Sequence, residues 1–229
     1  PLPAMDDRPP SVLTSIEDLT DLLRERTRRE HNTRQLIETL IGLVDERDPD
    51  AAHQSLYTAW LARHIAEDCG LNDSEVEAMV QAARLGNIGK IRIPRALLTK
   101  DGRLSEDELQ IVRQALDEGP NLLKNIAFDG PVLEILRQIN ERVDGGGRPR
   151  GLKGDQILLG AQIVALANTF VALVSPRAFR NGKTIEEAET ILLNEIGHRF
   201  DKRVVLSLLN YLNNKGGRAA WARMTGSDD

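Results

Sequence analysis

The chain of 229 residues can form one well-packed domain with an appendage, or two small domains. Its net charge of −5 and its aromatic content of 3% are unlike those of a broad nucleic-acid surface or a base-stacking platform, so we expect no nucleic acid and no anionic membrane as partner. The single cysteine, Cys69, excludes an internal disulfide and a thiolate metal cluster, and its helical surroundings favour a small core residue.

Residues 1–49 are predicted to form a helical linker. The N-terminus lacks the charged-then-apolar order of a signal peptide, and no stretch reaches the ~20 apolar residues that span a bilayer, so we expect a cytoplasmic location. Ser15 and Asp18 resemble a capping box, and apolar residues recur three or four positions apart from Leu36 to Val44. This spacing suits a helix over 11–47 that pairs with a second copy in a homodimer, or that packs on its own domain.

Residues 50–213 are predicted to form a compact all-α domain, followed by a flexible tail over 214–229. Apolar residues keep a helical spacing throughout, without the period-two alternation of strands. The predicted helices span 53–69, 73–85, 105–115, 130–142, 155–174, 184–196 and 200–213, and two of them begin with capping boxes, Ser105 with Glu108 and Thr184 with Glu187.

Five segments of this region form an ordered pattern. They read DPDAAH up to His53, ARLGNIGKIRIP over 83–94, LLTKDGRLSEDE over 97–108, INERVDGGGRPRGLKG over 139–154 and ANTFVALVSPRAFR over 167–180. In this order and spacing they resemble the HD-GYP family of cyclic-dinucleotide phosphodiesterases. The resemblance implies an HD-superfamily helical bundle and, for the family, phosphodiester hydrolysis at a two-metal site.

The resemblance also implies seven metal-ligand positions, of which only one holds a good ligand here. Four good ligands give structural zinc roughly 10–16 kcal/mol of binding free energy, and one imidazole with a few amides supplies a small fraction of that. We therefore predict a metal-free, catalytically inactive relative that uses no cofactor. The seven positions are His53, Gly86, Asn87, Ala115, Ile139, Asn140 and Asn168.

Three asparagines replace charged or ligating residues of the family at these positions. Asparagine keeps hydrogen-bonding capacity without charge, so Asn87, Asn140 and Asn168 predict a neutral polar pocket. Such a pocket either satisfies neighbouring backbone groups or binds a small ligand. In the second case Lys90 and Arg142 are the expected ligand contacts; Lys90 would otherwise cap a carbonyl group or form an ion pair.

The glycine-rich loop is a second candidate functional feature. In the family this loop is implicated in docking diguanylate cyclase (GGDEF) domains. Arg148 replaces the family's tyrosine, which adds charge and removes an aromatic anchor, so a GGDEF-type partner and another acidic signalling protein both stay open. Glu141, with Arg142, is expected to form a hydrogen-bonded corner. The predicted interface comprises Asp144, Gly145, Gly147, Arg148 and Pro149.

Three hypotheses of function follow. The first is an inactive signalling module that acts through protein contacts or dimerisation in cyclic di-GMP-type signalling, downstream of a sensor or receiver domain. The second is a non-hydrolytic nucleotide sensor, in which the ligand shifts helix packing. The third is a residual metal-dependent cyclic di-GMP phosphodiesterase, which would use Asp48, Asp50 and Glu141 beside His53; the two aspartates otherwise cap the following helix.

Overall fold

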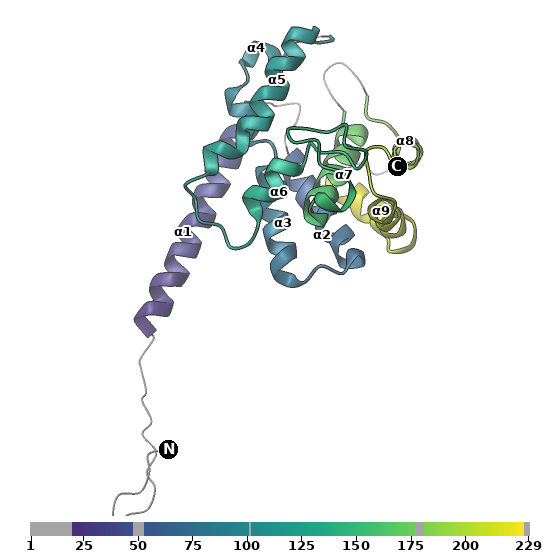
Figure 1. Cartoon of the computed structure of the whole chain (residues 1–229). Coiled ribbons are helices and arrows are strands. Elements are labelled where there is room, and N and C mark those ends of the chain that lie inside the picture. The colour runs from purple at the N-terminus through teal and green to yellow at the C-terminus, as the bar shows by residue number, and fades with distance from the viewer. Residues whose placement is uncertain (1–19, 48–52, 101, 177–180, 227–229) are drawn as a thin grey trace, which may run out of the picture. The chain divides into compact units, whose positions relative to one another are not determined.

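The computed structural model describes residues 20–47, 53–100, 102–176 and 181–226 (Figure 1). Within these ranges every regular element is a helix, with two isolated β-bridges in addition, and the prediction of an all-α fold is confirmed. The chain divides into two compact units, Pro1–Thr39 and Leu40–Asp229. In the described ranges, no helix combines the length and the apolar character needed to cross a membrane.

The helices follow the predicted order along the chain. The predicted start of the first helix, with Ser15 and Asp18, lies outside the described residues. The elements are α1 (Thr20–Asp45), α2 (Gln54–Cys69), α3 (Asp73–Leu85), η2 (Ile88–Arg92), α4 (Arg95–Leu98), α5 (Glu106–Glu118), η3 (Gly119–Leu123), α6 (Val132–Gln138), η4 (Gly154–Gln156), α7 (Leu159–Val174), α8 (Ile185–Asn194), α9 (Lys202–Asn214) and α10 (Gly217–Thr225), where η denotes a 3₁₀-helix.

Side chains at the helix starts explain where several elements begin. The Ser105 side chain accepts a hydrogen bond from the Glu108 amide, and the Glu108 carboxylate accepts one from the Ser105 amide at 2.7 Å. Thr184 and Glu187 form the same arrangement at α8, so both predicted capping boxes are confirmed. These reciprocal bonds satisfy amides that have no partner within the helix.

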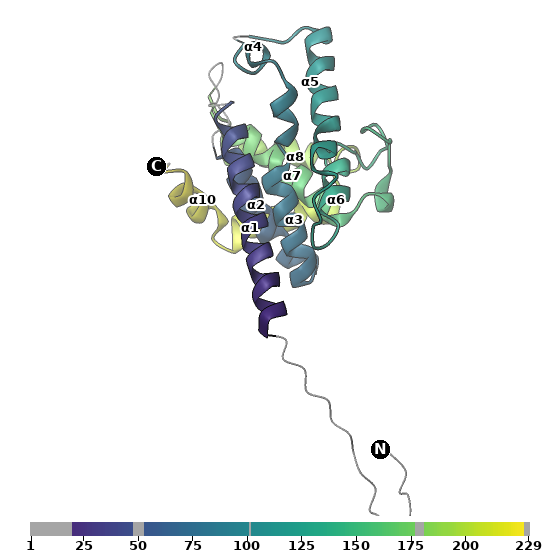
Figure 2. The same cartoon turned by 90° about the vertical axis from the view of Figure 1, so that its left-hand side faces the viewer.

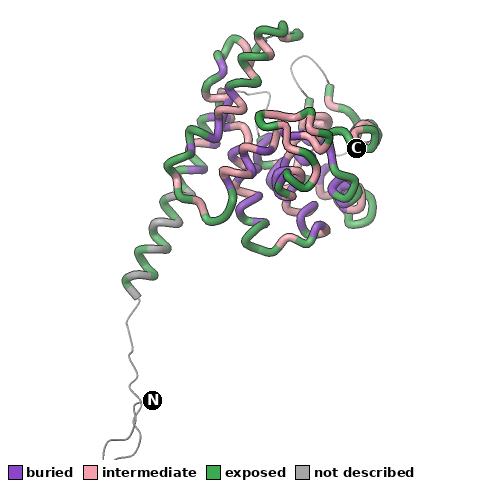
Figure 3. The backbone as a smooth tube through the Cα atoms, viewed as in Figure 1, coloured by how far each residue is buried: buried purple, intermediate pink, exposed green. Residues whose placement is uncertain are grey.

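The core lies where α2 packs against α3 and α7 (Figure 3). α7 is the most apolar of these helices, and Phe170 on it is fully buried. Cys69 at the end of α2 is 3% exposed, and its Sγ lies 3.4 Å from Ser207 Oγ on α9. Burial raises the pKa of the Cys69 thiol, which matches the expected small core residue.

Two helices are shorter than predicted. α6 begins only after Pro131 and ends at Gln138, beyond which the chain turns into the glycine-rich loop. α7 begins at Leu159, because residues 154–156 form the separate turn η4. Periodicity of apolar residues therefore predicted the existence of both helices, whereas local turns decide their ends.

Residues 217–225, in the segment where we expected a flexible tail, form α10. Trp221 on this helix is 6% exposed and packs edge-on against Tyr57 and Phe170, with ring centroids 5.5 Å apart in each pair. Trp60 also belongs to this group, 6.3 Å from Trp221. Such aromatic pairs contribute about 0.5–1.5 kcal/mol each beyond the area that they bury, so they hold α10 on the domain.

Two glycines let η2 and the α5–η3 corner approach closely. A Cβ atom at Gly89 would lie 2.5 Å from the Ala115 carbonyl oxygen, and one at Gly119 would lie 2.8 Å from the Gly89 Cα. Backbone therefore packs directly on backbone at this crossing. Beyond it, α4 and the first turns of α5 extend past the bundle of α2, α3 and α7 (Figures 1 and 2).

Candidate functional site

The seven predicted positions lie mainly at helix ends. His53 precedes α2, Gly86 and Asn87 follow α3, Ala115 is near the end of α5, Ile139 and Asn140 follow α6, and Asn168 is within α7. The structure brings two of them, Gly86 and Ile139, into contact. A Cβ atom on Gly86 would lie 3.8 Å from Ile139 Cδ1, and Ala115 contacts the crossing at Gly89. The remaining positions contact other residues, of which Gln54 and Asp117 were not predicted.

Asn168 is paired with Gln54, which the sequence analysis did not single out. Gln54 is 6% exposed, and its Nε2 donates to Asn168 Oδ1 at 2.9 Å. The preceding residue, His53, is exposed and adopts a left-handed backbone conformation with φ of 64°. Its ring centroid is 6.1 Å from that of Tyr57. The only sequence signal for Gln54 was its position next to His53.

Asn140 takes part in a three-residue cluster with Asp117 and Arg148. Asn140 Nδ2 donates to Asp117 Oδ1 at 3.0 Å, and Arg148 Nε donates to Asp117 Oδ2 at 2.7 Å. The Arg148 amide also donates to the Asn140 carbonyl oxygen at 3.0 Å. Asp117 was not predicted as a site residue, because its partners lie in a loop distant in sequence. The charge of Arg148 was the one sign that an acidic partner lies nearby.

Asn87 lies in tightly packed surroundings. It lines a gap of about 170 Å³ together with Asp45 and Arg84, and this gap has no room for a water molecule. The Asn87 carbonyl oxygen accepts from the Lys90 amide at 2.9 Å, and Lys90 is half-buried in η2. Ser55 Oγ lies 3.4 Å from Asp45 Oδ2 on the other side. A nucleotide does not fit into this gap.

Glu141 anchors the glycine-rich loop from inside. It is 5% exposed, and its carboxylate accepts the Arg150 amide at 2.8 Å and the Leu152 amide at 3.0 Å. Gly147 lies against the same corner, because a Cβ atom there would be 2.3 Å from the Arg142 backbone nitrogen. The loop backbone is therefore held in one shape by a buried carboxylate and by a contact that only glycine permits.

The outer side of the loop is held by an ion pair. Arg142 donates to Asp144 through Nε at 3.2 Å and through its NH2 at 3.0 Å, and the Gly146 amide donates to Asp144 at 2.7 Å. The Arg142 guanidinium, followed by the Gly146 amide, lowers the pKa of Asp144. Of the predicted interface residues, Pro149 is exposed, and Gly145, with φ of 83°, packs against Lys153.

The side chains at the seven positions do not fit a two-metal centre. Gly86, Ala115 and Ile139 carry no donor atom, and the amides of Asn140 and Asn168 bond to neighbouring side chains. In the part of the chain that the structure describes, no three His, Cys, Asp or Glu side chains come together as a metal-binding group. Asp48 and Asp50 lie outside the described residues, and Glu141 is bonded to loop amides. We assign no catalytic step to a metal.

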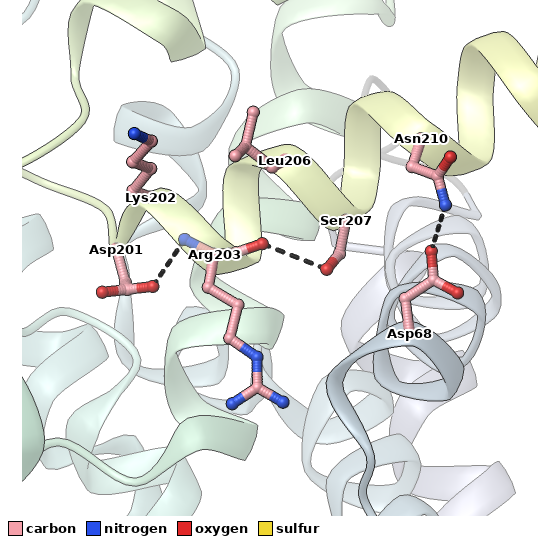
Figure 4. Close-up of a pocket in the computed structure, with 7 residues that line it drawn as sticks. All are labelled: Asp68, Asp201, Lys202, Arg203, Leu206, Ser207 and Asn210. Atoms are coloured by element: carbon pink, nitrogen blue, oxygen red, sulfur yellow. Dashed lines mark hydrogen bonds between the residues drawn. The ribbon is translucent and has the colours of Figure 1, made fainter.

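A shallow depression of about 660 Å³ lies at the other end of α2 from His53 (Figure 4). Its polar groups bond to one another: Asn210 Nδ2 donates to Asp68 Oδ2 at 2.6 Å, and Arg203 donates to the Cys69 carbonyl oxygen at 2.6 Å. Lys215, followed by Asn210, lowers the pKa of Asp68. Because this surface is shallow and open, we place the candidate site at the Asn140 end.

Comparison with known proteins decides the family. A family model described as HD domain matches residues 16–204. The chain belongs to the HD domain family. This HD domain is 34% identical over 209 residues to a cyclic di-GMP phosphodiesterase of Thermotoga maritima. The aligned region covers 87% of the chain and 56% of that protein. It is 35% identical over 191 residues to the cyclic di-GMP phosphodiesterase response regulator RpfG of Xanthomonas campestris. Here the aligned region covers 82% of the chain and 50% of that protein.

A solved structure shows the same fold. The HD domain matches a cyclic GMP-AMP-specific phosphodiesterase of Vibrio cholerae (V-cGAP3) with a TM-score of 0.61 and 20% sequence identity, over 80% of this chain and 50% of that one. The chain thus spans about half the length of the relatives that it matches. The predicted relationship to the HD-GYP phosphodiesterases is confirmed by the family match and by these relatives.

The prediction that the chain is not an enzyme is wrong, because relatives 34% and 35% identical over most of its length are phosphodiesterases. That prediction rested on the residues at seven aligned positions, whereas the relatives are similar to the chain over 82–87% of its length. The missing ligands are a property of the seven positions and do not by themselves establish inactivity.

Proposed function

We propose that this HD domain acts on a cyclic dinucleotide as a phosphodiesterase domain, within cyclic di-GMP-type signalling. The observation that carries the proposal is the identity of 34–35% to two cyclic di-GMP phosphodiesterases over 82–87% of the chain. The reaction would add water across one phosphodiester bond and release a linear dinucleotide. The chain spans about half of each relative, so the proposal does not extend to any further domain of those proteins.

The described residues supply substrate contacts rather than a metal centre in this proposal. Asn140, Asp117 and Arg148 present amide, carboxylate and guanidinium groups on one side of the bundle, next to a loop that Glu141 holds in shape. Of these groups, the Arg148 guanidinium and the Asn140 amide can donate to a phosphate, and the Asp117 carboxylate orients both of them. A GGDEF-type protein and another acidic signalling protein both stay open as partners of the loop at Arg148.

The experiment combines turnover and metal analysis on one sample. Purified chain is incubated with cyclic di-GMP, and in parallel with 3′3′-cGAMP, with added Mn²⁺, Fe²⁺ or Mg²⁺ and with EDTA, and products are separated by chromatography. We expect a linear dinucleotide in an amount proportional to the protein. Elemental analysis shows whether a metal accompanies the activity. Absence of product under every condition would contradict the proposal, and heat-denatured protein serves as the control.

We further propose that α1 pairs with a second copy of the chain. Leu36 and Leu43 are seven residues apart on α1 and are 66% and 51% exposed, which is the spacing of a coiled-coil seam. Sedimentation should show a dimer for the wild type and a monomer for the double variant Leu36→Glu, Leu43→Glu. Leu193→Glu, at an exposed leucine of α8, should leave the dimer intact. A monomeric wild type at all concentrations would refute the pairing.

A further inference from the structure

The loop around Arg148 presents this side chain from a fixed backbone. Its amide donates to the Asn140 carbonyl oxygen at 3.0 Å, and the neighbouring Gly147 has no room for a Cβ atom. Two residues further on, the Arg150 amide is bound by the buried Glu141 carboxylate at 2.8 Å. Because the backbone on both sides is anchored, little ordering of the loop is needed when a ligand binds to Arg148.

The Arg148 guanidinium is oriented, but its hydrogen-bonding capacity is only partly used. Nε donates to Asp117 Oδ2 at 2.7 Å, and the other Asp117 oxygen is held by Asn140. Among the described residues, the two terminal nitrogens of Arg148 make no hydrogen bond. The Arg148 side chain is 38% exposed, whereas Asp117 is 17% exposed. Four N–H donors of a planar cation thus remain for a ligand.

Further guanidinium groups lie near Arg148. Desolvation is the main cause that lowers the pKa of Arg199, and the charges of Arg142 and Arg148 lower it further. The acidic groups that face this cluster are Asp117 on Arg148, Asp144 on Arg142 and Glu195 near Arg199. An anion that binds to Arg148 would compete with Asp117 for its guanidinium.

We propose that Arg148 binds a phosphate group of the cyclic dinucleotide through its terminal nitrogens, with Asp117 and Asn140 as the residues that orient it. A guanidinium fork matches two non-bridging oxygens of a phosphodiester, which a lysine ammonium cannot do in the same way. This contact requires no bound metal ion, which agrees with the side chains at the seven positions, because they do not fit a metal centre. The inference rests on the proposed function and names the phosphate contact of that site.

The test measures the affinity of the whole chain for cyclic di-GMP by titration calorimetry in the presence of EDTA. We expect Arg148→Ala to weaken binding about tenfold or more, and Arg148→Lys to lie between wild type and Arg148→Ala. Arg150→Ala is the matched control, because it removes the same charge from the same loop and leaves the backbone bond to Glu141. It should change the affinity by less than about twofold. Circular dichroism melts confirm that each variant is folded.

A fourth variant tests the orienting role of Asp117. Asp117→Asn turns one acceptor into a donor that faces Asn140 or Arg148, so Arg148 loses part of its fixed orientation and binding should weaken. If the wild type binds and Arg148→Ala binds as well as Arg150→Ala, the role of Arg148 is refuted while the proposed function stands. Binding by the wild type that EDTA abolishes would also overturn it. A wild type that neither binds nor hydrolyses cyclic di-GMP would refute the proposed function itself.

Discussion

Replacing Glu141 by alanine is expected to lower the free energy of unfolding by about 3 kcal/mol. The buried carboxylate accepts the amides of Arg150 and Leu152, and hydrogen bonds to a charged group contribute about 1.5–3 kcal/mol each. Alanine would leave two amides without an acceptor at the base of the loop. For a chain of this size the melting temperature should fall by roughly 6–12 °C, measured by far-ultraviolet circular dichroism.

Two further variants make this result specific. Glu141→Gln keeps the size of the side chain but turns one acceptor into a donor that faces a backbone amide, so we expect a smaller loss than for alanine. Glu46→Ala removes an exposed carboxylate and should change stability by less than about 0.5 kcal/mol. A Glu141→Ala variant as stable as Glu46→Ala would mean that the loop is not held by this carboxylate.

Replacing Gly89 by alanine is expected to destabilise the domain by about 3 kcal/mol, at the upper end of overpacking changes. The new Cβ atom would lie 2.5 Å from the Ala115 carbonyl oxygen and 2.7 Å from the Leu116 Cα. Both atoms belong to the backbone, so no side-chain rotation relieves the contact and α5 must move. Urea unfolding followed by circular dichroism measures the loss.

Gly42→Ala is the matched control for this substitution. Gly42 lies within α1, and a Cβ atom there would meet nothing within 4 Å. Alanine should stabilise this helix by roughly 0.5–1 kcal/mol, because it restricts the unfolded chain and favours the helix. Equal effects of the two substitutions would contradict the close crossing of η2 and α5. Movement of α5 would also displace Asp117, so Gly89→Ala should weaken cyclic di-GMP binding as well.

Most of the helices could be predicted from the sequence, because their signals are local. The boxes at Ser105 and Thr184 and the spacing of apolar residues depend on neighbours within one or two turns. α10 was missed because its stability comes from contacts between Trp221 and rings on α2 and α7. No signal within its own nine residues distinguishes it from a frayed tail.

The candidate site was predictable only in part, for the same reason. The resemblance located Asn140, Asn168 and the glycine-rich loop, but their partners lie far away in sequence. Gln54 and Asn168 are 114 residues apart, and Asp117 and Arg148 are 31 apart. Pairings at such separations are set by helix packing, which a single sequence does not display. The prediction of inactivity was wrong because it rested on seven positions, whereas the similarity to phosphodiesterases extends over most of the chain.

Both tryptophans of the chain, Trp60 and Trp221, lie in the aromatic group that holds α10. Intrinsic fluorescence therefore reports on one locality of the molecule, at the contact of α2 and α10, and it has no reporter in the Arg148 loop. Heating that detaches α10 first would change the emission spectrum before the helical signal falls. Coincident curves would instead show that the C-terminal helix and the bundle unfold as one cooperative unit.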